Sequence, residues 1–164
     1  MASSGATVIE RSSPEAGSEA AAGREVTRRR QRLVWLLRLG GVIEACAFFA
    51  VVTPRAWLAE AHADLGLGDM PAAAVLDFMI RQSSFVYGMH GLLLWFVASD
   101  VVRFAPVIRF LGLTFLCYSA AFLVIDWWTE MPVWWTICDP IATGLFGWLV
   151  VRWGALECVA ADEE

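Results

Sequence analysis

Several ionisable side chains lie inside long apolar stretches of this sequence, where a charge is costly unless it is paired or has a function, and five of them are candidates for chemistry. These residues are Glu44, Asp77, Arg81, His90 and Asp139. Asp77 and Arg81 are four positions apart, so on a helix they share one face and can form an ion pair. Charges of this kind occur at proton relays, at ion sites and at the polar ends of ligand pockets.

The positions of Glu44, Arg81 and Asp139 predict a similar depth for the three side chains, so that packed helices can bring them together. One Arg between two carboxylates leaves either a net negative charge or one protonated carboxylate. Such a cluster can serve as a proton or cation site, or as the polar end of a ligand pocket. The alternative, which the sequence favours, is an ion pair that only fixes how the helices pack.

His90 is predicted to be a polar core residue, because metal sites need clustered ligands and the only other histidine, His62, lies in a separate link. We therefore predict no metal site.

The sequence also lacks a P-loop, a dinucleotide-binding glycine motif, a zinc-protease motif and a catalytic triad. We predict no catalytic residues and favour a non-enzymatic protein, with the cofactor, if there is one, left open.

The composition indicates which elements position these residues. Of the 164 residues 59% are hydrophobic and 18% are charged, whereas soluble domains have about 45–50% and about 25%. This excludes a disordered chain and a basic nucleic-acid-binding protein. Four apolar stretches have the length of about 20 residues that crosses a bilayer as a helix, and they cover residues 33–52, 74–98, 105–125 and 132–151. We predict an all-α integral membrane four-helix bundle over residues 33–154.

A longer link follows the first span, and its pattern predicts a short amphipathic helix on the membrane surface. Thr53 is expected to cap this helix, with Pro54 at its first position. Gly66 and Gly68 are expected to end it, and Pro71 to open the second span.

Arginine is concentrated just before the first span, at Arg28, Arg29, Arg30 and Arg32. Positive charge gathers on the cytoplasmic side of membrane proteins, so we predict that both termini are cytoplasmic. The same side chains can contact anionic lipid heads. Residues 1–32 are predicted to be a disordered tail and residues 155–164 a short acidic tail. The expected location is a cell membrane, the inner membrane of a bacterium.

Small residues recur at the spacing that lets helix backbones approach closely. The pairs are Gly41 with Ala45, Ser84 with Gly88, and Thr143 with Gly147. The same spacing serves packing within one chain and between chains, so a homo-oligomer or a partner membrane subunit stays open. Pro140 is predicted to bend the last span, because it lacks the N–H of a helical hydrogen bond.

A series of short motifs is spread over residues 33–154. They are the Arg-Leu-Gly-Gly at 38–41, Pro54 and Leu65-Gly66 in the link, then Arg81, Arg109 and Asp139. With these motifs the chain resembles the DoxX-like class of small four-span membrane proteins. The resemblance implies a four-helix bundle in the cytoplasmic membrane, and some members of the class are tied to quinone-linked sulfur oxidation. Residues 1–32 lie outside the resemblance, and the extended link departs from its most compact members.

Three functional hypotheses follow. The first is a non-enzymatic accessory protein or hydrophobic-ligand-binding bundle in the lipid bilayer. The second, from the resemblance, is a small membrane subunit of a quinone-linked redox system. The third is a proton-coupled transporter that acts through Glu44 and Asp139.

Overall fold

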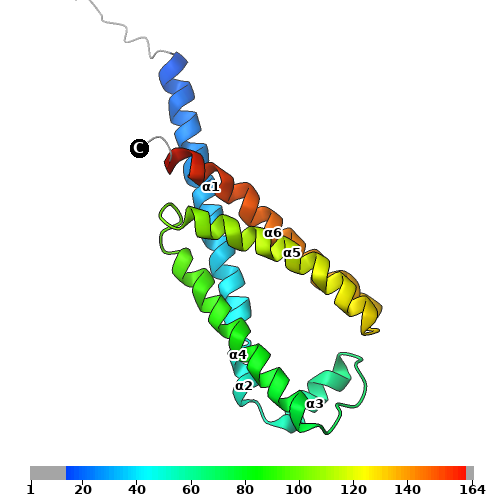
Figure 1. The fold of residues 1–164 in the computed structure, drawn as a ribbon. Coiled ribbons are helices and arrows are strands. Elements are labelled where there is room, and N and C mark those ends of the chain that lie inside the picture. Colours follow the sequence, from blue (N-terminus) through cyan, green and yellow to red (C-terminus); the bar gives the residue numbers. More distant parts are fainter. Residues whose placement is uncertain (1–13, 162–164) are drawn as a thin grey trace, which may run out of the picture.

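The computed structural model describes residues 14–161, and all regular structure in this range is helical (Figure 1). The helices are α1 (Pro14–Ala45), α2 (Phe48–Val52), α3 (Arg55–Asp64), α4 (Ala74–Val97), α5 (Ala105–Trp128) and α6 (Val133–Ala161). The predicted all-α fold is confirmed for this range. The long helices coincide closely with the apolar stretches at 74–98 and 105–125, because hydrophobic runs of this length favour helix wherever lipid offers the backbone no partner.

Within the described range, three stretches are long and apolar enough to cross a membrane: 23–52 of α1 and α2, 105–128 of α5, and 133–154 of α6. α4 has the same length as α5, 24 residues, but it includes Asp77, Arg81 and His90 and is less apolar. The structure therefore supports a membrane protein with three spanning stretches.

The long helices form two antiparallel pairs that meet at one end. α4 packs along α1, and α5 and α6 form a closer hairpin. Their shared core is Leu33, Leu37, Leu94, Ile108 and Val150, one or two residues from each long helix, and all five are fully buried. Beyond this core the α5–α6 hairpin diverges from α4, and α2 and α3 lie at the far end of α4 (Figure 1).

Glycine sets the closest approaches in both pairs. A Cβ atom on Gly91 of α4 would stand 2.6 Å from the Gly41 oxygen and from the Ala45 nitrogen of α1. A Cβ atom on Gly147 of α6 would stand 2.8 Å from the Gly112 oxygen of α5. These backbones pack closely because the glycines lack a side chain. The predicted small-residue positions at Gly41, Ala45 and Gly147 thus lie at contacts within the chain.

The N-terminal prediction fails in part. α1 begins at Pro14, so residues 14–32 are helical rather than disordered. Ala, Glu and Arg, which favour helix even without an apolar stripe, are frequent there. The exposed Glu25 and Arg29, four residues apart, form an ion pair that supports this turn. Residues 1–13 lie outside the described range. At the other end α6 continues to Ala161, so the predicted acidic tail is helical up to that residue.

The link after the first span contains the predicted short helix, α3, but its boundaries differ. The hydroxyl of Thr53 donates to the Phe49 oxygen of α2 at 2.6 Å instead of capping α3, which begins at Arg55. Gly66 and Gly68 have positive φ angles of 79° and 77° and end the helix as predicted. Pro71 does not open α4, which begins three residues later. The Pro71 oxygen accepts a hydrogen bond from Arg55 at 2.7 Å within the link.

Candidate functional site

Four of the five candidate residues form two separate pairs, and the fifth, Asp139, lies apart from both. The first pair is Asp77 and Arg81 on one face of α4, as the spacing predicted, with Nε of Arg81 3.1 Å from Oδ2 of Asp77. The same guanidinium donates to the carbonyl oxygens of Val51 and Thr53 at the end of α2. Arg81 therefore ties α4 to the last turn of α2, where the helix dipole favours a cation.

The second pair joins α1 to α4. Nδ1 of His90 lies 2.5 Å from Oε2 of Glu44. The His90 and Glu44 side chains are only 25% and 17% exposed, so most of the pair is shielded by neighbouring helices. One of these neighbours is Phe115 of α5, whose ring centroid lies 5.4 Å from that of His90. His90 is thus a partly buried polar residue with a carboxylate partner that the sequence did not predict.

The predicted cluster of Glu44, Arg81 and Asp139 does not form. Glu44 pairs with His90, nine residues from Arg81 along α4, which is about 13.5 Å on a helix. Asp139 of α6 makes no ion pair among the described residues. The fold places it instead within electrostatic range of Tyr87 and of Asp126. The α1–α4 pair and the α5–α6 pair diverge beyond the shared core (Figure 1). Glu44 and Arg81 belong to the first pair and Asp139 to the second, so a similar depth does not bring them together.

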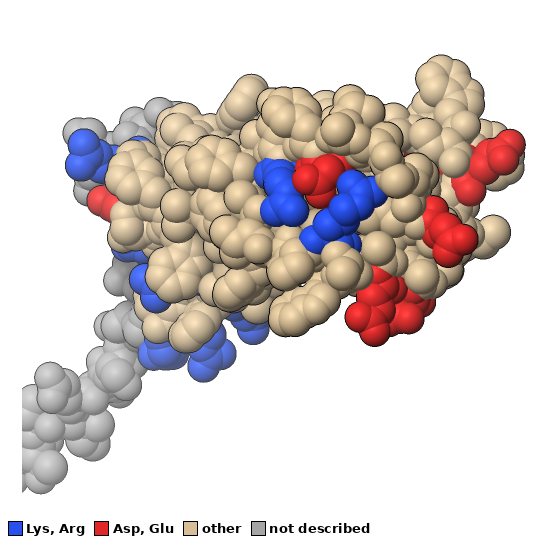
Figure 2. Space-filling model, turned by 90° about the horizontal axis from the view of Figure 1, so that it is seen from below, with Lys and Arg blue, Asp and Glu red and all other residues tan. Residues whose placement is uncertain are grey.

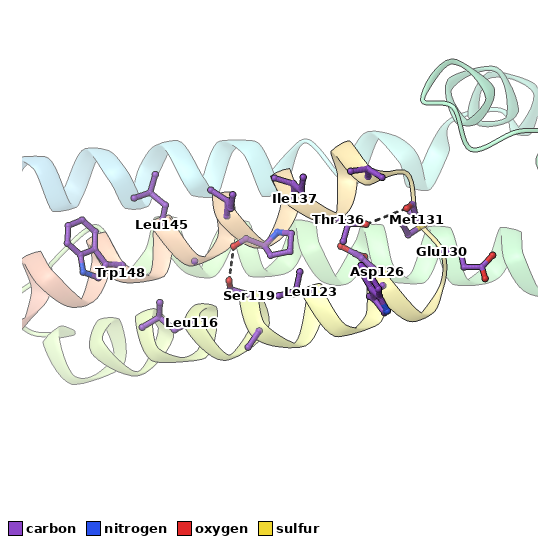
Figure 3. A pocket seen from close by; sticks show the side chains of 16 residues that line it. Leu116, Ser119, Leu123, Asp126, Glu130, Met131, Thr136, Ile137, Leu145 and Trp148 are labelled. Carbon is purple, nitrogen blue, oxygen red and sulfur yellow. Dashed lines mark hydrogen bonds between the residues drawn. The ribbon is translucent and has the colours of Figure 1, made fainter.

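A groove that the sequence analysis missed lies between α5 and α6 near their connecting turn (Figure 3). Its volume is about 1180 Å³. Most of the lining is apolar, and Leu116, Leu123, Ile137, Leu145 and Trp148 are among the side chains that face it. The polar lining side chains are few: Ser119, Asp126, Glu130 and Thr136. Ligand pockets commonly have this arrangement, with an apolar wall and a small number of placed polar groups.

Pro140 shapes the wall of the groove. α6 runs through this proline without a break, but the missing N–H leaves the Thr136 carbonyl without its helical donor. On the facing helix Ser119 donates to the Pro140 oxygen at 2.7 Å. A Cβ atom on Gly144, one turn further along, would stand 2.7 Å from the Ser119 hydroxyl. The two helices are therefore joined at the middle of the groove through backbone and small side chains.

Asp126 is the least exposed charged residue of the groove. Its relative exposure is 8%, and its Oδ2 atom is buried with no hydrogen-bond partner in the described part of the chain. The sequence analysis placed Asp126 in the connection after the third span, whereas α5 continues to Trp128. The helical spacing could have predicted the burial of Asp126. The residue lies on the same face of α5 as the buried Ile108, Leu111 and Phe115.

The predicted basic anchor lies on the surface of α1. Arg28, Arg30 and Arg32 are exposed, and Arg29 bonds to Glu25. Arg103 and Arg152 closely follow Val101 and Val150, which belong to the same buried core as Leu33 and Leu37 of α1. Figure 2 looks at the opposite end, where α2 and α3 lie, and shows acidic side chains gathered mainly toward one edge. This charge distribution motivated the predicted orientation, which remains a prediction.

The described residues contain no group of three or more His, Cys, Asp or Glu side chains that could hold a metal ion. Comparisons of the chain with protein families, curated proteins and solved structures give no match. The DoxX-like resemblance, the quinone-linked role and the predicted oligomer or partner subunit therefore stay predictions.

Proposed function

We propose that this chain is a four-span membrane protein that binds an apolar ligand in the groove between α5 and α6. The observation that carries the proposal is the groove itself, which combines a volume of about 1180 Å³ with a largely apolar lining. Both of its helices are long and apolar enough to cross a bilayer, so a hydrophobic molecule can enter from the lipid phase.

The proposal treats α4 as the fourth span. Its 24 residues correspond to about 36 Å of helix, more than the roughly 30 Å of hydrocarbon in a bilayer. The charges that lower its hydropathy are partnered: Arg81 by Asp77 and His90 by Glu44. Pairing of this kind lowers the cost of placing ionisable groups in a membrane. The Arg-rich end would then face the cytoplasm, with both termini on that side.

The test is a binding titration with a chain-brominated alcohol, since bromine quenches nearby tryptophan fluorescence and Trp127 and Trp148 line the groove. We expect saturable quenching of the purified chain by ω-bromododecanol. Ala120→Phe should abolish most of it, because Ala120 lines the groove and the larger ring fills it.

The matched control is Ala121→Phe. Ala121 is exposed on the same helix but does not line the groove. It should leave the titration unchanged. Equal quenching in both variants would show that the alcohol binds elsewhere and would contradict the proposal.

A second candidate is proton-coupled transport, which is favoured by one observation. The shielded Glu44–His90 pair lies between two long helices, and both Glu44 and Asp139 lie within electrostatic range of Tyr87. Chains of carboxylate and histidine side chains carry protons in membrane proteins. Proton flux in proteoliposomes tests it. Flux that survives both Glu44→Gln and Asp139→Asn would exclude these carboxylates as the route.

A further inference from the structure

The groove is polar at one end and apolar at the other. Asp126, Glu130 and Thr136 line it near the connecting turn of the hairpin, and Leu116 and Trp148 line it at the far end (Figure 3). Leu116 and Asp126 are ten residues apart on α5, which is about 15 Å along the axis. An elongated molecule with one polar head and an extended tail matches this shape.

At the polar end of the groove, the ligand is expected to donate a hydrogen bond rather than to accept one. Oδ2 of Asp126 is buried and unpartnered in the described part of the chain, and the residue is only 8% exposed. An ionised carboxylate accepts hydrogen bonds and cannot donate them. Oδ2 has almost no accessible surface, so a ligand in the groove reaches the carboxylate through its other oxygen. Asp126 lines the groove, and a ligand that donates a hydrogen bond to this carboxylate supplies a partner for a largely buried acceptor.

The charge of the polar end points to a cation. Two carboxyl side chains, Asp126 and Glu130, line it. No Arg or His is among the residues that line the groove. A bare metal ion fits poorly, because no group of three His, Cys, Asp or Glu side chains is present in the described residues and the rest of the groove is apolar.

From these observations we infer that the groove selects a lipophilic amine, a single-chain ligand whose ammonium group bonds to Asp126 and whose tail extends toward Trp148. The inference rests on the proposed function and specifies its ligand class. An ammonium head supplies both the positive charge and the hydrogen-bond donors that the carboxylate lacks. The hydroxyl of a neutral lipid can donate a hydrogen bond but carries no positive charge, and a fatty-acid carboxylate carries the same charge as Asp126.

The experiment uses the full chain in a non-ionic detergent and two probes with the same tail, ω-bromododecylamine and ω-bromododecanol. Tryptophan quenching gives the affinity of each probe. A charge-assisted hydrogen bond to a buried group is worth about a ten-fold or larger difference in affinity. We expect the amine to bind the natural chain more tightly than the alcohol by at least this factor.

The variants locate the effect. Asp126→Asn should reduce the amine to about the affinity of the alcohol and change the alcohol much less, because the alcohol can donate a hydrogen bond to the carboxylate but carries no positive charge. The matched control is Glu60→Gln, which removes an exposed carboxylate of α3 that does not line the groove, and it should keep the full preference. Trp148→Phe should remove more of the quenching than Trp127→Phe, because the bromine is at the tail end.

The results distinguish a failure of amine selectivity from a failure of ligand binding in the groove. If amine and alcohol bind the natural chain equally, the inference is overturned and the groove remains an apolar ligand site. If neither probe gives saturable quenching, the inference and the proposed function both fail. An amine preference that persists in Asp126→Asn also overturns the inference, since the head would then be recognised elsewhere. Should that variant not fold, Ala120→Phe, which fills the groove, is compared with the same two probes. It should remove the amine preference, and a preference that survives it overturns the inference.

Discussion

Replacing Arg81 by Met provides a direct measure of how α4 is held against α2. Arg81 donates to Asp77 and to the carbonyl oxygens of Val51 and Thr53, so one substitution removes three hydrogen bonds to a single cation. Methionine keeps much of the apolar stem, which limits the change to the charged head. It also leaves Asp77 without its partner, although Oδ1 of that carboxylate is already buried and unbonded among the described residues.

The structure sets the expected size of the effect. Breaking a buried charge pair by removing one partner costs about 3–5 kcal/mol. The Arg81 and Asp77 side chains are 31% and 30% exposed, so water replaces part of what is lost and the cost is reduced. We expect Arg81→Met to lower the free energy of unfolding by about 2 kcal/mol. In a chain of this size that corresponds to a fall in Tm of about 4–8 °C.

The same chain supplies the control. Glu25 and Arg29 have the same spacing and the same order of acid and base as Asp77 and Arg81, but their side chains are 63% and 39% exposed. Such surface pairs on a helix contribute about 0.3–0.5 kcal/mol. Arg29→Met should therefore change Tm by no more than about 2 °C. Thermal unfolding in one detergent, followed by circular dichroism, compares the two variants.

A double-mutant cycle with Asp77→Asn completes this test. If the two residues are coupled, Asp77→Asn should recover part of the loss caused by Arg81→Met, since the unpaired charge is then gone. Equal Tm losses for Arg81→Met and Arg29→Met would refute the reasoning, because they would mean that burial and the α2 carbonyls add nothing to the local pair.

Two further predictions concern the contact of α1 with α4. Gly91→Ala should destabilise the chain by about 1–3 kcal/mol, because the new Cβ atom would stand 2.6 Å from backbone atoms of α1. A Cβ atom on Gly23 would have nothing within 4 Å, so Gly23→Ala should stabilise the chain by up to about 1 kcal/mol. Thermal unfolding of both variants should show a lower Tm for Gly91→Ala and a higher Tm for Gly23→Ala. Glu44→Gln keeps a hydrogen-bond acceptor for His90 and should cost less than Glu44→Leu, which leaves the imidazole unpaired. Equal losses in those two variants would indicate that packing, rather than the hydrogen bond, holds this site.

The sequence predicted what depends on local pattern. The apolar stretches located α4 and α5 to within a few residues, and the four-residue spacing of Asp77 and Arg81 predicted their pair. The Glu44–His90 pair joins residues 46 positions apart. It depends on the register of α1 against α4, which the close approach at Gly91 fixes. A single sequence shows which residues are small enough to allow this register. It does not show which residue of the neighbouring helix each of them contacts.

The groove was missed for a related reason. Asp126 was read as part of a connection because the apolar count falls at that residue, yet α5 continues beyond it to Trp128. An error of three residues at a helix end moved the least exposed charge of the groove out of the membrane-spanning segment. In a membrane protein the informative polar residues often lie at such ends, where a hydropathy window is least sensitive. If the helical spacing of the buried residues of α5 is continued beyond Ile125, the next position on the same face is Asp126. This residue is the one on which the amine proposal depends.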